Sequence, residues 1–351
     1  MALTLAREPM SKFKTLAASA FALLLSAACQ HLTASPSVEI KRSGVLGYAT
    51  ITTDTAYWLD NDRVLFIGGK PGVFEKLPDG RQPHKRFLME WNTSTGEVKT
   101  HAEMGADSNA LCYDRGYVRY GFSTGNRTVS KAGLLGQEVD ITTSVLKDGV
   151  TRRRVNPLTC REYDQQFVRS TYGEGFLPLK EERSYLGGRP DALQRKMSVY
   201  ITAVNGEQRE LLVPVLGTNP RWSEYAGAYV LRRSEDLFSA TKTTGKLWLL
   251  MPSGATKEFD IPAGPWFRGS TSYGITKRGI FMRSHAIANF GNGDAGGYLI
   301  EANKPERFIE GYIFSFSVSP DGCKIALNIK SAGEADDRAE MVMANVCARG
   351  N

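Results

Sequence analysis

Short runs rich in Val, Ile, Leu and aromatic residues, separated by polar turns, follow one another along the chain from residue 45 onward. Such runs, bounded by Asp, Asn, Gly and Lys, are typical of β-strands joined by tight turns. One arrangement, consisting of a strand, a polar turn and a second strand, recurs six times. The six copies are 56–67, 109–122, 156–169, 219–232, 272–283 and 316–329.

A second arrangement, an apolar strand, a turn and a further strand, follows most of these copies. It occurs at 87–100, 198–213, 246–261 and 298–309, more weakly at 132–145, and as a single strand at 340–346. Equivalent positions in the first strands are Trp58, Cys112, Cys160, Trp222, Gly274 and Val318, which lie between 44 and 62 residues apart. Four strands in each unit at this spacing predict an all-β fold, a β-propeller of about six four-stranded blades.

The last unit lacks a fourth strand, and a candidate for it lies at the other end of the chain, at 45–52. We expect this N-terminal strand to close the last blade, because closure leaves no open sheet edge. Two alternatives stay open at this point. One is an open stack or sandwich of the same sheets, and the other is a seventh blade within 170–196.

The last copy contains a more specific motif. The residues Ser-Pro-Asp-Gly at 319–322 precede the strand-like run Lys-Ile-Ala-Leu at 324–327. This resembles the repeat of TolB-type propellers, which has the form S-P-D-G-x-x-I-A-F. The other copies match that repeat in layout and not in letters, so the resemblance implies the fold and no particular function.

The first residues have the pattern of an export signal. Two lysines precede an apolar stretch, 16–28, which ends in small residues and is too short to span a bilayer. The residues Ser-Ala-Ala-Cys at 26–29 resemble the lipobox of bacterial lipoproteins, although Ser26 stands where that family usually has Leu. The resemblance implies that the signal is cut before Cys29 and that this cysteine is acylated.

The residue after the lipidated cysteine bears on location. In the lipoprotein family Asp at this position favours the inner membrane, so Gln30 implies an anchor in the outer membrane that faces the periplasm. The alternatives are a soluble periplasmic or secreted protein cleaved near Ala28, and a retained anchor. Translation begins at Met1 or at Met10.

These patterns divide the chain into three parts. Residues 1–28 form the signal peptide, 29–41 a polar tether with little to bury, and 42–351 the propeller domain. We expect the exported protein to be a monomer.

Four cysteines follow Cys29, and export allows them to be oxidised. Cys323 opens the second strand of the last unit and Cys347 ends its third strand. Since these strands run antiparallel, the two Cα atoms fall within the roughly 4.4–6.8 Å that a disulfide needs. Cys112 and Cys160 occupy the same place on neighbouring inner strands, which predicts either a second disulfide or two buried thiols.

The distribution of charge and the few potential metal ligands limit the kinds of partner and cofactor that we expect. The formal net charge is +7, and it is spread along the chain apart from three arginines at 152–154. No basic face with interleaved aromatic residues is visible, so we expect no nucleic-acid partner. The four histidines form no pair at ligand spacing and no CxxC occurs, so we expect no metal and no cofactor.

Propeller geometry narrows the search for a binding site. Connections between second and third strands share one face with connections between blades, and the former are long at 68–86, 170–196 and 284–296. The resulting ligand-binding candidates are Tyr172, Glu174, Arg221, Trp266, Arg268 and His285. Each also has an ordinary interpretation as a packed or solvated loop residue. Arg221 suits a carboxylate or phosphate, and His285 suits a general base.

Two functions follow from these observations. The favoured one is a non-catalytic, membrane-tethered binding module for an envelope protein or an anionic cell-envelope ligand. The alternative is a propeller-type hydrolase or lyase with an active site at the axial mouth, using His285 with Glu174 or Arg221. The sequence contains no nucleophile elbow, no Walker loop and no HExxH motif, which favours the binding module.

Overall fold

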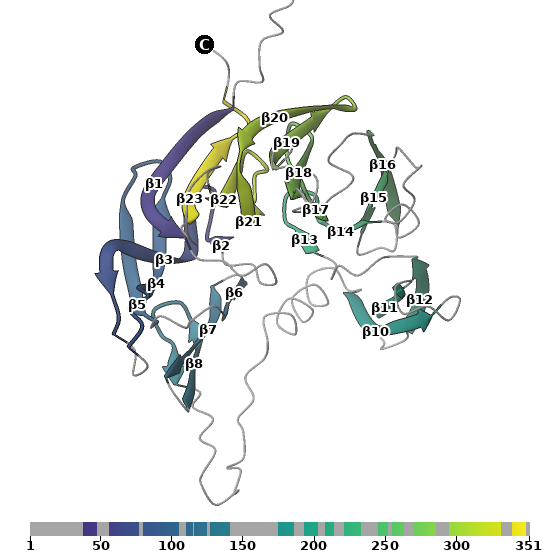
Figure 1. Ribbon diagram of the computed structural model, residues 1–351. Helices are drawn as coiled ribbons and strands as arrows, with labels where there is room; N and C mark the ends of the chain where they lie inside the picture. Colours follow the sequence, from purple (N-terminus) through teal and green to yellow (C-terminus); the bar gives the residue numbers. More distant parts are fainter. Residues whose placement is uncertain are drawn as a thin grey trace, which may run out of the picture. The chain divides into compact units, whose positions relative to one another are not determined.

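The computed structural model forms two compact units, Met1–Ser37 and Val38–Asn351, and the described residues all belong to the second. These residues are 38–47, 56–76, 80–104, 110–114, 116–124, 127–140, 175–185, 193–202, 208–213, 221–232, 245–251, 255–262, 270–285, 295–330 and 339–348. Their regular elements are all β-strands (Figure 1), which confirms the all-β fold class. None of the described residues forms a helix long and apolar enough to cross a lipid bilayer.

The strands form antiparallel sheets in which neighbours along the chain pair with one another. Sheet II contains β6 (Ala110–Asp114), β7 (Tyr117–Thr124), β8 (Arg127–Leu134) and β9 (Val139–Asp140). Sheet III contains β10 (Gly175–Tyr185), β11 (Leu193–Thr202) and β12 (Gln208–Val213). Sheet IV contains β13 (Arg221–Ser223), β14 (Ala228–Arg232), β15 (Gly245–Leu250) and β16 (Thr256–Ile261). Sheet V contains β17 (Ser270–Ile275), β18 (Ile280–His285), β19 (Gly296–Glu301) and β20 (Lys304–Glu310).

An eight-stranded sheet joins the beginning of the unit to its end. One half, sheet I, contains β2 (Ala56–Trp58), β3 (Arg63–Phe74), β4 (His84–Asn92) and β5 (Val98–Glu103). The other half, sheet VI, contains β21 (Tyr312–Val318), β22 (Lys324–Lys330) and β23 (Ala339–Asn345). Between them lies β1 (Glu39–Gly47), which pairs with both β23 and β3. Figure 1 shows β1 in purple beside β23 in yellow, so an N-terminal strand supplies the fourth strand of the last sheet.

Several predicted elements differ from the observed ones. The N-terminal strand spans Glu39–Gly47, so it begins six residues before the predicted start at 45, because its pairing uses backbone groups and needs no apolar side chain; residues 48–52 lie outside the described residues. The connection expected at 68–86 is largely a continuation of β3 and β4, whose antiparallel pairing runs past the buried core. The stretch 170–196 was likewise expected to be a loop, yet it contains β10 and the start of β11. The repeat copy at 156–169 lies outside the described residues.

Apolar side chains from consecutive sheets form shared cores, so sheets pack face to face. Sheets II and I share Leu111, Val118, Leu65 and Leu88. Sheets I and VI share Trp58, Phe66, Ala326 and Met341. Sheets VI and V share Ile325, Val342, Phe281 and Leu299. Sheets V and IV share Tyr273, Met282, Leu247 and Leu249. Among the described residues the sheets therefore follow one another in the order II, I, VI, V, IV.

First strands of neighbouring sheets lie side by side in this series. The Tyr57 hydroxyl on β2 donates to the carbonyl of Leu111 on β6 at 3.1 Å. The Trp58 indole Nε1 donates to the carbonyl of Ser317 on β21 at 2.9 Å. On β17, a Cβ added to Gly274 would come within 2.8 Å of Val318 on β21, so glycine is required by the close approach. The repeat positions taken from the sequence thus mark the contacts between sheets.

Candidate functional site

Most of the predicted ligand-binding residues lie outside the described residues. This applies to Tyr172, Glu174, Trp266 and Arg268, and also to Cys29 and Cys160. The backbone positions of the other two candidates are described. Arg221 opens β13 opposite Val230, and His285 ends β18 opposite Ser270. Each lies at the end of its sheet where the second and third strands connect.

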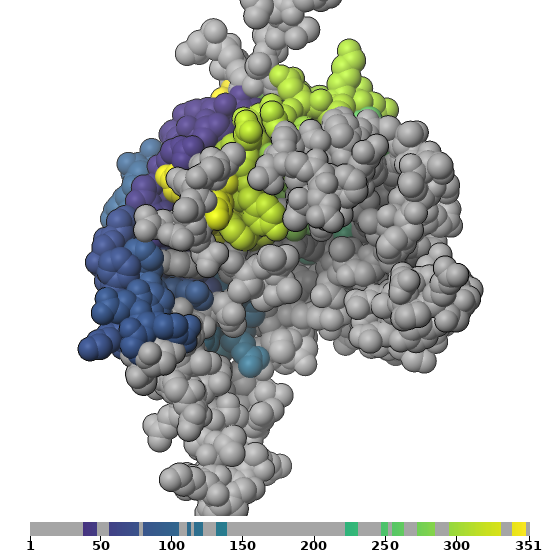
Figure 2. Space-filling view, viewed as in Figure 1, coloured from purple at the N-terminus to yellow at the C-terminus, as the bar shows by residue number. Residues whose placement is uncertain are grey.

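At the corresponding end of sheet I, β3 and β4 stay paired with each other after the pairing of β3 with β1 has ended. The last pairs between β1 and β3 are Leu46 with Gly69 and Gly47 with Gly68. Beyond this point β3 continues to Phe74, and β4 begins at His84. We call residues 70–76 together with 80–86 the hairpin arm. Dark blue residues from this part of the chain stand at the surface in Figure 2.

The base of the hairpin arm is rigidly packed. A Cβ added to Gly68 would lie 2.6 Å from the Phe66 ring and 2.7 Å from the Met89 sulfur, so the backbone touches the core directly. On the arm, the Glu75 N–H donates to the carbonyl of Pro83 at 2.9 Å, which continues the pairing toward the tip. The arm is therefore an extension of buried strands and not an independent loop.

An aromatic pair, with one exposed and one half-buried ring, lies on the hairpin arm. Phe74 is 52% exposed, and its ring stacks on His84 with centroids 4.4 Å apart and planes inclined by 28°. His84 Nδ1 is buried without a hydrogen-bond partner, while the outer face of the Phe74 ring stays accessible. An exposed aromatic ring held in one orientation loses little conformational entropy on binding and suits an interface anchor.

Several cationic residues also belong to the hairpin arm. Lys70 Nζ lies 5.3 Å from the centroid of the Phe87 ring, and Lys85 forms an ion pair with Glu103. Lys76 and Arg81 are exposed near the tip. Cations of this kind attract carboxylates or phosphates, and the exposed Phe74 ring on the same arm offers apolar contact.

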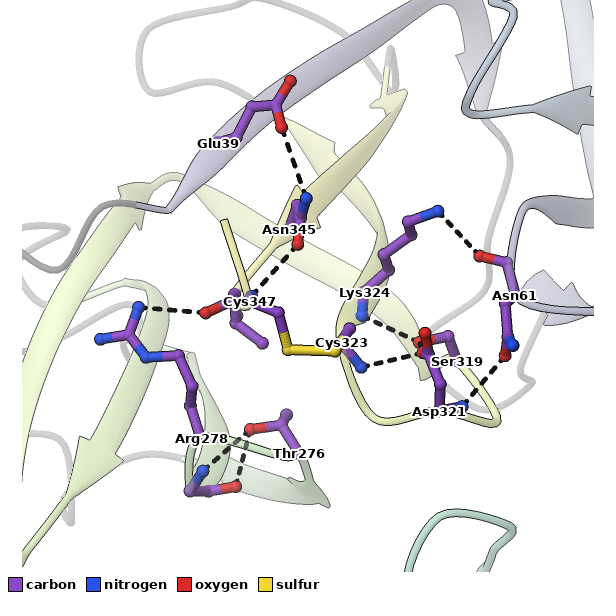
Figure 3. The surroundings of a disulfide bond; sticks show 12 residues. Glu39, Asn61, Thr276, Arg278, Ser319, Asp321, Cys323, Lys324, Asn345 and Cys347 are labelled. Carbon is purple, nitrogen blue, oxygen red and sulfur yellow. Dashed lines mark hydrogen bonds between the residues drawn. A yellow bond between two sulfur atoms is a disulfide. The ribbon is translucent and has the colours of Figure 1, made fainter. Parts of the chain in front are cut away.

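The turns between first and second strands lie at the end of the sheets away from the hairpin arm, and turns of neighbouring sheets are hydrogen-bonded to one another (Figure 3). The side-chain oxygen of Asn61 accepts from the Asp321 N–H at 3.1 Å, and Lys324 Nζ donates to the Asn61 carbonyl at 2.9 Å. The backbone N–H of Lys277 donates to the Gly322 carbonyl at 2.9 Å. These bonds join sheets I, VI and V, so this end of the described structure is held together by its turns.

The Ser-Pro-Asp-Gly motif is explained by the turn that it forms. Ser319 Oγ accepts from the Lys324 N–H at 2.8 Å, and the Asp321 carboxylate accepts from the Cys323 N–H at 3.0 Å. Gly322 has φ +73°, and an added Cβ would lie 2.6 Å from the Tyr225 ring. The motif residues therefore satisfy backbone groups and permit close packing, which is a structural role.

A disulfide joins Cys323 and Cys347 beside this turn, as the strand register in the sequence predicts. The Cα atoms lie 5.0 Å apart, and the Val346 N–H donates to the Cys323 carbonyl at 2.8 Å. Arg278 on the neighbouring sheet donates to the Val346 carbonyl at 3.0 Å. Cys112 is also disulfide-bonded, and its predicted partner Cys160 lies outside the described residues.

Two aspartates on the β2–β3 turn have lowered pKa values. Burial acts to raise the pKa of Asp60, but hydrogen bonds from the Asp62 backbone and from Arg63 outweigh it. The pKa of Asp62 is lowered by its hydrogen bond from Lys324 and next by one from Ser94. Both carboxylates are therefore charged at neutral pH and act as acceptors within the interlocked turns.

A chain of polar side chains also crosses sheet I. Arg63 Nε donates to Asp60 at 2.6 Å, and Arg63 lies 3.4 Å from Glu90. Glu90 in turn lies 2.8 Å from His101 Nε2. Sequence reasoning did not single out these residues, because the contacts depend on the register of three strands. In the part of the chain that the structure describes, no three His, Cys, Asp or Glu side chains are grouped to hold a metal ion.

No protein-family model matches the sequence, and no curated protein matches it. Solved structures with some likeness include TolB from Acinetobacter baumannii, at 12% identity and a TM-score of 0.38, covering 81% of this chain and 64% of that one. Another is an oligogalacturonate lyase in complex with manganese, at 12% identity and a TM-score of 0.39, covering 89% and 94%. A third is the Cps50 (Swd1) β-propeller domain of Myceliophteria thermophila, at 8% identity and a TM-score of 0.40, covering 86% and 99%. This chain spans less than two thirds of the TolB chain, and likenesses this distant identify no function.

Proposed function

We propose that this protein is a non-catalytic binding module, a β-propeller tethered to the outer membrane that binds a protein or another cell-envelope ligand. The observation that carries the proposal is the hairpin arm. Its exposed aromatic ring and cations are held on strands that are buried at their base. Binding groups on a rigid scaffold are pre-organised, which reduces the entropy lost on association.

The proposed propeller has about six blades, and β1 serves as the fourth strand of the last one. Support comes from the place of β1 between β23 and β3, and from the shared cores that link sheets II, I, VI, V and IV. Each of these sheets is apolar on the faces that meet its neighbours. A sheet of this kind is stable only when both faces are covered, which favours radial stacking.

The proposed anchor is Cys29, acylated after removal of residues 1–28, with the following residues as tether. The lipobox-like sequence supports this, and the Cys323–Cys347 disulfide is compatible with an exported, oxidising location. We retain Tyr172, Glu174, Arg221, Trp266, Arg268 and His285 as proposed ligand-binding residues. In this proposal they lie at the same end of the sheets as the hairpin arm.

Fractionation and crosslinking of intact cells test the proposal. The full chain, tagged at its C-terminus, is compared with a Cys29→Ser variant. We expect the unaltered chain in the membrane fraction and the variant in the soluble fraction, with a defined crosslinked complex for the unaltered chain. Equal partition of both chains would refute the lipid anchor. The absence of any complex, together with substrate turnover by the purified chain, would favour the alternative hydrolase or lyase.

A further inference from the structure

We infer that the hairpin formed by β10 and β11 binds a phosphate group carried by an apolar body, which is the chemistry of an acidic phospholipid. This rests on the proposed function, because it names one ligand class for that binding module. The inference is drawn from the register of the two strands. Three features carry it: the part of the hairpin that continues past β12, the residues that share one of its faces, and the residues toward its tip.

The hairpin continues as a two-stranded ribbon after the pairing with its third strand has ended. The last pair between β11 and β12 is Met197 with Val213, but the pairing of β11 with β10 goes on toward the turn. The further pairs are Glu182–Lys196, Arg183–Arg195, Ser184–Gln194 and Tyr185–Leu193. We call residues 182–185 together with 193–196 the basic ribbon. Among the strands that the structure describes, none pairs with either outer edge of this ribbon.

The two faces of the basic ribbon differ in charge. Successive residues of a strand belong to opposite faces of a sheet, and residues directly opposite one another share a face. Glu182 therefore shares one face with Lys196, which is a pair of opposite charge. The other face contains Arg183 opposite Arg195, which is a pair of like charge. The register thus balances the charge on the first face and concentrates positive charge on the second.

An anion bound to both arginines explains a pair of this kind. Directly opposed residues have Cβ atoms roughly 4.5–5.5 Å apart, and like charges at that spacing destabilise a strand pair. A phosphate monoester carries up to two negative charges and three acceptor oxygens, so two guanidinium groups can donate to it at once. Glu181 precedes the ribbon on the same face, so one carboxylate stands against two arginines. The charge that remains on this face is positive and suits a phosphate.

The next residues toward the tip add an apolar contact beside this charge. Tyr185 lies opposite Leu193, and each is two residues from an arginine of the pair, so all four belong to one face. An inorganic phosphate ion has nothing to place against an aromatic and an aliphatic residue, whereas a phosphate ester with an acyl chain has. The combination on this face therefore favours an amphiphilic phosphate over the free ion.

Fluorescence anisotropy of the purified full chain tests the inference. The probe is a labelled short-chain phosphatidic acid, used below the concentration at which it forms micelles. Unlabelled phosphatidic acid, inorganic phosphate and phosphatidylcholine of the same chain length are the competitors. We expect inorganic phosphate to compete about 10-fold more weakly than phosphatidic acid, and phosphatidylcholine, whose phosphate is paired with its own cation, not to compete. Equal competition by inorganic phosphate would assign the site to the free ion and overturn the amphiphilic ligand.

Matched variants locate the binding. Arg195→Gln is compared with Lys196→Gln, which removes the same charge from the other face of the basic ribbon. We expect about a 10-fold loss of probe affinity for the first variant and less than a 2-fold change for the second, with circular dichroism showing that both fold. Equal losses in the two variants would show attraction to net charge alone and would overturn the inference.

Two further variants separate the parts of the ligand. Tyr185→Ser should weaken the binding of phosphatidic acid by about 5-fold and leave the competition by inorganic phosphate unchanged, because only the apolar contact is lost. Glu181→Gln should strengthen probe binding by about 3-fold, because it removes the carboxylate that competes for the arginines. A gain of affinity cannot come from misfolding, so unchanged or weaker binding by Glu181→Gln would contradict the proposed site.

The two proposals fail in different ways. If the purified chain binds no phosphatidic acid but forms a crosslinked complex in cells, the phosphate site is wrong and the binding module stands. If the cells contain no complex and the purified chain turns over a substrate, the proposed function fails, whatever the anisotropy shows.

Discussion

Replacing Cys323 and Cys347 with Ser isolates what the disulfide contributes. The bridge closes a loop with a sequence separation of 24 residues. In the chain-entropy model, closing a loop of this length removes about 12 cal/mol/K from the denatured chain, or about 3.5 kcal/mol at 25 °C. The Val346-to-Cys323 backbone hydrogen bond does not depend on the bridge. We therefore expect the loss to arise mainly in the denatured ensemble.

Urea denaturation followed by intrinsic tryptophan fluorescence measures this loss. We expect the free energy of unfolding of the double variant to fall by about 3 kcal/mol, and its Tm by about 5 °C for a cooperative unit of roughly 300 residues. The matched control repeats the measurement in reductant, which breaks the bridges of both chains. The two chains should then agree within about 1 kcal/mol. A loss below about 1 kcal/mol without reductant, or a difference that persists in reductant, would refute the loop-closure reasoning.

Three further predictions concern contacts between sheets. Trp58→Phe should lower the free energy of unfolding by about 1–2 kcal/mol, because the Ser317 carbonyl loses its donor; an unchanged urea midpoint would contradict this. Gly322→Ala should lower the free energy of unfolding by at least about 1 kcal/mol more than Gly96→Ala does. Both glycines have positive φ, but only Gly322 has other atoms where the new Cβ would lie, so equal Tm values of the two variants would show that this crowding is unimportant. Asp62→Asn should lower the free energy of unfolding by up to about 1 kcal/mol at pH 7 and by progressively less as pH falls through the lowered pKa of Asp62, because the charged form is the stabilising one; a loss that does not decrease as the pH is lowered would exclude the ion pair as its source.

The strand pattern was largely predictable from the sequence, because it depends on local alternation and turn residues. Trp58, Trp222 and Gly274 were chosen for their equivalent spacing, and all three lie on first strands of their sheets. The Cys323–Cys347 pair could be named for the same reason, since register within one hairpin follows from the strand bounds.

The position of β1 was not predictable from side chains. Its sequence contains Lys41 and Arg42, and its first residues are exposed, so it resembles a polar tether. Backbone pairing with β23 makes it a strand, and such pairing requires no apolar side chain. The missing fourth strand of the last unit indicated that an N-terminal strand pairs there, but nothing in the side chains indicated that it begins at Glu39.

The hairpin arm was hidden for a related reason. Gly72 and Pro71 interrupt the apolar pattern of β3, so the segment has the composition of a loop. The register shift between Gly69 and Phe74 accommodates these residues and restores the pairing at His84. The region had been placed among the long connections of the functional end, but its exposed ring could be found only from the structure.

The place of β1 also connects the anchor with the stability of the last sheet. If Cys29 holds the protein to a membrane, any pull on the tether enters the fold at Glu39, where β1 begins. The load then passes along the strand into its antiparallel pairs with β23, so these hydrogen bonds are sheared together and not opened one at a time. Cys347 follows β23 closely, and its disulfide joins that end to the start of β22. The bridge therefore reinforces the corner at which the tether meets the sheet, and its loss should matter more under tension than at equilibrium.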